Sequence, residues 1–159
     1  MGEPISFESF FEEQRSRLFG ALSLVTGSRH EAEEIAQDAF LRLWERWDRV
    51  ATLDDPTGFL FRTAMNVFRN RARRSALALR RSLRLAPDTD DLAAVEDRDE
   101  MVRLIRVMTP RQRAAVVLTG YLGYSSEEAA DLLHVRASTV RALATKGRAT
   151  ARATMEGGR

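Results

Sequence analysis

Apolar side chains recur every three or four positions along most of the chain, the period of an amphipathic α-helix. Residues 6–25 follow this pattern, and Gly27 is typical of a helix end. Ser28, with Glu31 three positions later, has the spacing of a capping box and predicts a second helix over about 29–48. No segment of useful length alternates with a period of two. The pattern therefore predicts an all-α fold.

The second predicted helix carries apolar groups on two of its sides. Its main stripe consists of Ala32, Ile35, Ala36, Ala39, Phe40, Leu43 and Trp47. Leu41 and Trp44 lie off this stripe, beside Gln37 and Asp38. Apolar anchors ringed by polar groups are typical of partner surfaces. A neighbouring helix of the same domain that covers both residues would explain the pattern equally well.

A third helix is predicted to start at Pro56, with Asp55 as its cap, and to run into an arginine-rich stretch. Its polar side consists of Arg62, Asn66, Arg69, Asn70, Arg73 and Arg74. Arginines interleaved with asparagines fit contacts to phosphates and bases. Phe61 and Phe68 offer stacking surfaces for unpaired bases, although each of them taken singly is more typical of a core. The helical pattern weakens after Arg74.

A short acidic stretch divides the chain in two. Residues 86–98 contain Pro87 and a run of aspartates, and they read as a flexible linker. The predicted domains are therefore residues 1–85 and 99–159. The second domain has a helical stripe near its start. Thr109-Pro110 then begins a further helix, and Gln112 has the spacing to complete a capping box with Thr109.

The stretch from Gly123 to Ala149 predicts a short helix, a turn near His134 and a longer basic helix. Ser125 and Glu128 have the spacing of a capping box at the start of the first helix. Val140 and Leu143 are the expected buried side of the second helix. Its polar and basic groups are Arg136, Ser138, Thr139, Arg141, Thr145, Lys146 and Arg148. This pattern fits a helix-turn-helix that enters a DNA major groove, and it fits an ordinary helical hairpin equally well.

The formal net charge of +2 hides a strong segregation of charge. Residues 1–60 carry a net −6, residues 61–86 a net +8, residues 87–100 a net −6 and residues 101–159 a net +6. Two basic blocks on either side of an acidic one indicate two surfaces that face polyanions, joined by a connector. Chance clustering on solvated faces is the alternative, but residues 61–86 contain eight arginines and no acid.

Composition gives little support to an enzyme. The chain has no cysteine, its two histidines lie 104 positions apart, and it contains no glycine-rich phosphate loop. We expect no catalytic residue, no metal site, no cofactor and no small-molecule substrate. The N-terminus has no secretory pattern and no apolar stretch is long enough to span a bilayer, which favours a cytoplasmic protein without membrane insertion.

The two halves together resemble a bacterial RNA polymerase sigma factor of the sigma-70 family, in the extracytoplasmic-function (ECF) group. Residues 32–44 are similar to the family's polymerase-docking helix. Residues 55–66, followed by Asn70 and Arg73-Arg74, resemble the part that handles the minus-ten promoter element. Residues 104–113 and 123–130 resemble region four, whose helix-turn-helix reads the minus-thirty-five element. The chain departs from the family pattern at the turn, where His134 replaces the usual glycine, and over residues 136–138.

The resemblance implies a division of labour between these surfaces. Core RNA polymerase would dock on Glu34, Gln37, Asp38, Leu41 and Trp44, and the second domain would touch the polymerase flap. The arginine-rich helix would meet minus-ten DNA, loop 49–57 would hold a flipped base, and the basic helix of the second domain would bind minus-thirty-five DNA. An anti-sigma factor is a further candidate partner. The rival reading is a stand-alone helix-turn-helix regulator, which explains the second half but leaves the first half unexplained.

Overall fold

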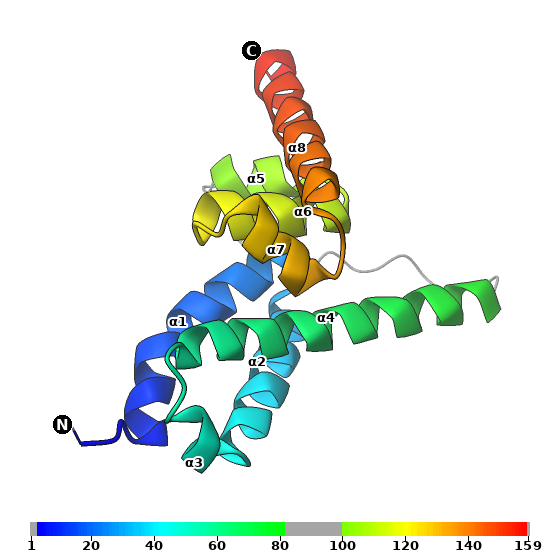
Figure 1. Ribbon diagram of the computed structural model, residues 1–159. Coiled ribbons are helices and arrows are strands. Elements are labelled where there is room, and N and C mark those ends of the chain that lie inside the picture. Colours follow the sequence, from blue (N-terminus) through cyan, green and yellow to red (C-terminus); the bar gives the residue numbers. More distant parts are fainter. Residues whose placement is uncertain (1–2, 82–99, 159) are drawn as a thin grey trace.

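The computed structural model describes residues 3–81 and 100–158, and every regular element within these ranges is a helix (Figure 1). The all-α prediction is confirmed. The elements in chain order are α1 (Phe7–Thr26), α2 (Arg29–Trp44), α3 (Trp47–Val50), α4 (Pro56–Arg81), α5 (Glu100–Arg106), α6 (Pro110–Val116), the π-helical turn η2 (Val117–Tyr121), α7 (Ser126–Leu133) and α8 (Ala137–Gly157). The predicted linker, 86–98, lies outside the described residues.

Local capping interactions determine where α1 ends and where α2 begins. Gly27 ends α1 in the left-handed region at φ 73°, where a glycine meets no steric cost. The Ser28 hydroxyl then accepts a hydrogen bond from the Glu31 N–H at 3.2 Å and starts α2. The two helices pack against each other along buried stripes that include Leu22 and Ile35.

The second helix is shorter than its sequence pattern predicts, because it ends at Trp44 and α3 begins separately at Trp47. This break takes Trp47 away from the α2 stripe and places its indole against the start of α1. The ring centroid of Trp47 lies 5.0 Å from that of Phe10 and 5.5 Å from that of Phe7, and its Nε1 donates a hydrogen bond to the Ile5 carbonyl at 3.2 Å. A long-range aromatic cluster therefore overrides the helical period here.

The predicted cap of α4 is confirmed: the Asp55 carboxylate accepts a hydrogen bond from the Gly58 N–H at 2.9 Å. The helix continues to Arg81, beyond Arg74 where the sequence pattern weakens. Phe61 is only 1% exposed and belongs to the core, so it offers no surface on which a base could stack.

In the second half, two capping boxes form as their spacing predicts, Thr109 with Gln112 before α6 and Ser125 with Glu128 before α7. Helix α8 approaches α6 closely at Gly147. A Cβ at this position would lie 3.0 Å from Cγ2 of Val116, so only a glycine allows the contact without movement of its neighbours.

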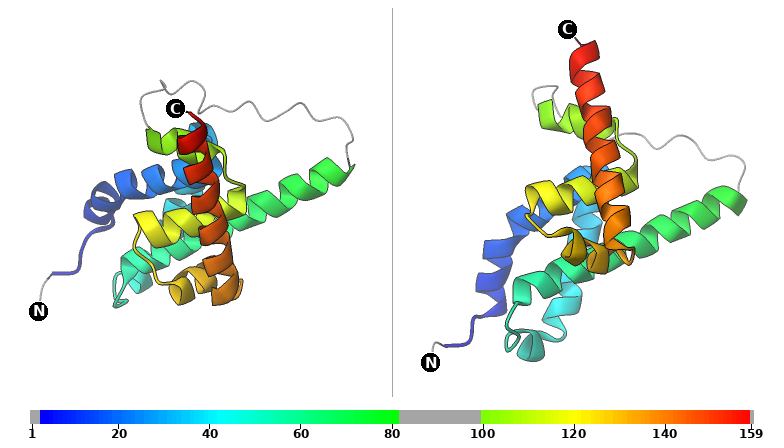
Figure 2. Two further views of the ribbon diagram at one scale, coloured as in Figure 1. Left: turned by 90° about the horizontal axis from the view of Figure 1, so that it is seen from above. Right: turned by 45° about the horizontal axis from the view of Figure 1, so that its top comes forward.

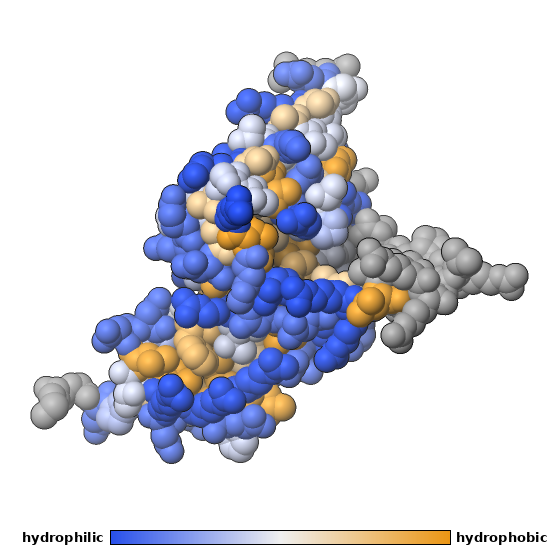
Figure 3. All heavy atoms as spheres, turned by 45° about the vertical axis from the view of Figure 1, so that its right-hand side comes forward, coloured by the Kyte–Doolittle hydropathy of each residue, from blue (hydrophilic) through white to orange (hydrophobic). Residues whose placement is uncertain are grey.

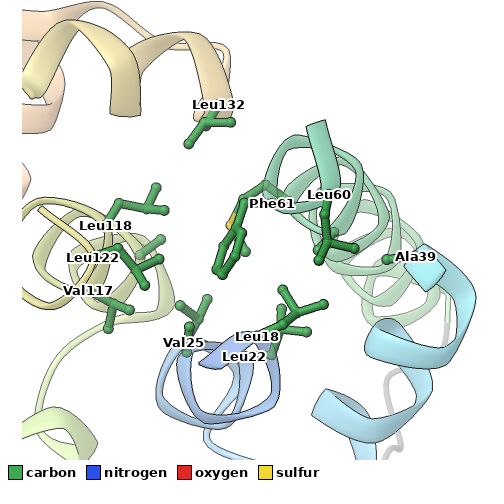
Figure 4. Packing of buried hydrophobic residues seen from close by; sticks show 14 of the residues in the cluster. Leu18, Leu22, Val25, Ala39, Leu60, Phe61, Val117, Leu118, Leu122 and Leu132 are labelled. Carbon is green, nitrogen blue, oxygen red and sulfur yellow. The ribbon is translucent and has the colours of Figure 1, made fainter. Parts of the chain in front are cut away.

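The two halves share one hydrophobic core. Figure 4 shows the Phe61 ring of α4 facing Leu118 and Leu122 of the second half, with Val25 and Leu22 of α1 below it. Leu132 of α7 lies on the side of the second half that faces α4. Helix α7 packs against α4, and α8 stands out from the body of the molecule with its C-terminal half (Figures 1 and 2).

Candidate partner and nucleic-acid interfaces

Leu41 and Trp44 are exposed on α2, with 54% and 58% of their surface accessible. No helix of the described chain covers them, so the explanation by an intramolecular neighbour does not apply to them. Gln37 is also exposed on this face, and Asp38 lies 3.4 Å from Nε of Arg42. Large exposed apolar groups within a polar rim are the pattern of a protein-docking surface.

Glu34, on the edge of the same face, has a partner within the chain. Its carboxylate accepts a hydrogen bond from Nη1 of Arg71 at 2.7 Å, which joins α2 to α4. This bond is the main reason that the pKa of Glu34 falls below its ordinary value of 4.5. Nε2 of His30 lies 3.2 Å from the other carboxylate oxygen. Arg71 is absent from the residues that the sequence singled out, because a bond between helices leaves no mark on local spacing.

The arginine-rich side of α4 is exposed over most of its length. Arg62, Asn70, Arg73 and Arg74 are exposed, whereas Asn66 and Arg69 are half-buried. Nη2 of Arg69 donates a hydrogen bond to Oδ1 of Asn66 at 3.2 Å. Burial, followed by the charge of Arg73, lowers the pKa of Arg69 below its ordinary value. Figure 3 shows a band of hydrophilic side chains across the middle of the molecule, between apolar patches above and below it.

A cavity of about 400 Å³ separates part of this side of α4 from the second half. Phe68, Arg69 and Ala72 line it from α4, and Leu133 and His134 line it from the helix-turn-helix. Nearer the start of α4, burial raises the pKa of Tyr124, and the carboxylate of Asp55 adds to this shift. Helix α7 contacts α4, so the second half covers part of this helix.

A second cavity, of about 410 Å³, lies where α3 leads into α4. It is lined by Arg46, Arg49, Val50, Leu53, Asp54, Asp55, Gly58, Phe59 and Arg62. Three arginines, two aspartates and one aromatic ring give it hydrogen-bonding groups of both kinds and a stacking surface. This pocket is built largely by the loop that the sequence singled out. Arg46 extends it, and only the short α3 brings that residue to the rim.

The helix-turn-helix has the geometry that its spacing predicts. Two hydrogen bonds between Ser125 and Glu128, at 2.9 and 3.0 Å, start α7. His134 then turns the chain in the left-handed region at φ 53°. Helix α8 buries Val140, while Leu143 is half-buried beside the cavity against α4.

The candidate DNA-binding groups of α8 are almost all accessible. Exposed are Arg136, Ser138, Arg141, Thr145, Lys146 and Arg148, and Thr139 is half-buried. Nη1 of Arg141 donates a hydrogen bond to Oε1 of Glu127 on α7 at 3.1 Å. The sequence did not single out Glu127, which stands beside the capping residue Glu128.

An apolar groove of about 360 Å³ opens between α5, the π-helical turn η2 and the C-terminal half of α8. Its lining includes Leu104, Ile105, Met108, Val116, Tyr121 and Met155, with Arg148 and Arg152 at its edge. Tyr121 and Met155 are 51% and 48% exposed. The groove therefore offers apolar surface with positive charge beside it.

Comparison with known proteins shows the family to which the chain belongs. The family model described as Sigma-70 region 2 matches residues 10–78, and that described as Sigma-70, region 4, matches residues 98–150. The RNA polymerase sigma-E factor of Streptomyces avermitilis is 29% identical over 95% of this chain and 84% of its own length. The ECF RNA polymerase sigma factor SigG of Mycobacterium tuberculosis is 30% identical over 89% of this chain and 46% of its own length. The chain belongs to the ECF group of the sigma-70 family.

The fold agrees with this assignment. The sigma factor RpoE of Bartonella quintana, solved in complex with the anti-sigma factor NepR, has a TM-score of 0.73 at 18% identity, over 96% of this chain and 98% of its own. As a sigma factor, the chain binds core RNA polymerase and promoter DNA and directs transcription initiation. The match to region 2 covers the first half of the chain. The alternative interpretation, a stand-alone helix-turn-helix regulator, gives no explanation for this half.

None of the helices in residues 3–81 and 100–158 is long and apolar enough to cross a membrane. Within the described ranges, no group of three or more histidine, aspartate or glutamate side chains is placed to hold a metal ion.

Proposed function

We propose that residues 1–85 dock on core polymerase and handle the minus-ten element, that residues 86–98 connect the halves, and that residues 99–159 read the minus-thirty-five element. The observation that carries the proposal is the exposed pair Leu41 and Trp44, two large apolar side chains that lie on one face of α2 within a polar rim. The order of the two family matches along the chain supports the same division.

The docking surface is the face of α2 formed by Glu34, Gln37, Asp38, Leu41 and Trp44. Leu41 and Trp44 supply the apolar anchors, and the polar residues form their rim. Glu34 stands at the edge of this face, where its carboxylate also holds Arg71. The arginine-edged groove of the second half is our candidate for the contact with the polymerase flap, because an amphipathic helix with acidic residues fits both its apolar floor and its charge.

The minus-ten surface is the side of α4 with Arg62, Asn66, Arg69, Asn70, Arg73 and Arg74. The arginines would contact phosphates and the asparagines base edges as the strands separate. The cavity at the start of α4 is suited to a flipped base, since Phe59 offers a ring for stacking and Arg62 and Asp54 offer donors and acceptors. Unstacking a base costs a few kcal/mol, which such contacts offset.

The minus-thirty-five surface is the exposed side of α8. Arg136, Ser138, Thr139 and Arg141 stand in its first turns, where base-edge contacts concentrate. Thr145, Lys146 and Arg148 follow, and we assign them to the DNA backbone. The chain would work in the cytoplasm without catalytic turnover of its own, and the complex of its structural neighbour RpoE with NepR supports an anti-sigma factor as a regulatory partner.

The docking surface is tested by changing Leu41→Asp and Trp44→Ala together. We expect the double variant to keep its helical content but to lose co-purification with core polymerase and promoter-directed transcription. The matched control is Ile5→Ala, which removes an exposed apolar side chain of similar accessibility, 56%, outside the docking surface. Normal co-purification of the double variant with core polymerase would show that this face of α2 is not part of the interface.

A further inference from the structure

One ion pair links the two helices of the helix-turn-helix on their exposed side. Oε1 of Glu127, in the first turn of α7, accepts a hydrogen bond from Nη1 of Arg141 on α8 at 3.1 Å. Both side chains are well exposed, 71% for Glu127 and 57% for Arg141. Exposed ion pairs contribute little to stability, so the fold gives little reason for this contact.

The geometry of the pair leaves most of the guanidinium available. An arginine has five N–H donors, and the hydrogen bond to Glu127 engages Nη1. A free arginine side chain gives up considerable rotamer entropy when it binds in one orientation. A carboxylate that already fixes the guanidinium removes part of this cost before DNA arrives. The carboxylate also stays ionised, because the Glu127 N–H and then Arg141 lower the pKa of Glu127 below its ordinary value of 4.5.

We propose that Glu127 is a positioning residue that holds Arg141 in the orientation in which it reads a base pair of the minus-thirty-five element. The inference rests on the proposed function, in which α8 enters the major groove. A guanidinium held from one side is suited to a bidentate contact with the O6 and N7 atoms of a guanine. Glu127 itself makes no base contact in this arrangement.

The proposal predicts opposite effects on specific and non-specific DNA. A carboxylate beside the DNA repels the phosphates, so its removal strengthens binding to every sequence. Its removal also frees Arg141 to adopt other orientations, so the preference for one base pair falls. A residue that merely stabilised the fold would weaken binding to all sequences instead. The positioning role and the structural role therefore predict opposite changes in the binding of non-specific DNA.

The test uses the full chain with core polymerase on a promoter library randomised over the minus-thirty-five element. Glu127→Gln keeps the shape of the side chain and removes its charge. We expect this variant to lose preference at one base pair by about fivefold or more, the lower end of what a bidentate arginine contact supplies. Binding of the variant to unrelated duplex DNA should rise. Asp131→Asn is the matched control, since it removes an exposed carboxylate from the same helix and should leave base preference unchanged.

Arg141→Ala separates this inference from the proposed function. If Arg141→Ala and Glu127→Gln lose preference at the same base pair, and the double variant loses no more than Arg141→Ala alone, the positioning role is supported. If Arg141→Ala changes base preference and Glu127→Gln does not, the positioning role is wrong while the base contact stands. If Arg141→Ala leaves promoter choice unchanged, the assignment of Arg141 to base reading fails. A uniform loss of binding by Glu127→Gln would overturn the positioning role and indicate a structural one.

Discussion

His134 occupies the turn between α7 and α8 with a backbone conformation that suits glycine better. Its φ of 53° and ψ of 45° place it in the left-handed region. Its N–H donates a hydrogen bond to the Ala130 carbonyl at the end of α7. Histidine is among the non-glycine residues found there more often, but its Cβ still approaches the following carbonyl. The departure from the usual turn glycine therefore keeps the helix-turn-helix fold at some cost in stability.

Replacing His134 with glycine should stabilise the chain by about 1 kcal/mol, because the relief of the left-handed strain exceeds the entropy that glycine adds to the unfolded state. Urea unfolding followed by circular dichroism measures the difference. His134→Val is the opposing control, since a β-branched side chain is least tolerated in this region and should lower stability. A glycine variant that is no more stable than the parent would show that the turn carries no strain.

At the scale of the helices, local signals predicted most of the fold and long-range contacts account for the misses. The capping boxes at Thr109 and Ser125 depend on residues three positions apart, and both form. The predicted end of α2 was wrong because Trp47 packs against the start of α1. No local sequence pattern indicates this long-range contact. Arg71 and Glu127 were missed for the same reason, because each acts on a residue of another helix. The roles of the candidate site residues stay predictions.

The ion pair between Glu34 and Arg71 should make the packing of α2 on α4 depend on pH. Because the pKa of Glu34 is lower in the folded chain than its ordinary 4.5, the pair stabilises the fold above that value. The contribution is lost as the pH falls through the lowered pKa of the folded state. Glu34→Gln should therefore be less stable than the parent at neutral pH, and the difference should vanish in acid.

Urea midpoints of parent and variant across this range measure the effect. Glu33→Gln is the matched control, since Glu33 is exposed on the same helix and its loss should leave the pH profile unchanged. Equal midpoints of Glu34→Gln and the parent at neutral pH would show that the bond between the helices contributes nothing to stability.

At the scale of the whole molecule, the two proposed DNA-binding surfaces differ in accessibility. The exposed side of α8 faces solvent, whereas Asn66 and Arg69 on α4 are half-buried, and Arg69 lines the cavity against the second half. The minus-thirty-five and minus-ten elements are named for their positions on the DNA, which are roughly 25 base pairs apart. This separation is about 85 Å along B-form DNA. The radius of gyration expected of a folded chain of this length is only about 15 Å. Since α4 and α7 are in direct contact here, the halves have to separate before one molecule binds both elements.

Holding the halves together should therefore block promoter opening but leave minus-thirty-five binding intact. The chain has no cysteine, so Ala72→Cys and His134→Cys would place its only two thiols on opposite walls of the cavity between α4 and the helix-turn-helix. A short bifunctional reagent with a cleavable bridge can join them. We expect the bridged chain to bind a minus-thirty-five duplex through α8 as the parent does. With core polymerase it should fail to open a promoter, and cleavage of the bridge should restore opening. Single-cysteine variants that carry the same reagent control for its bulk at each position. Normal transcription by the bridged chain would show that the packed arrangement is compatible with promoter binding, because the bridge leaves the two halves no other route to elements so far apart.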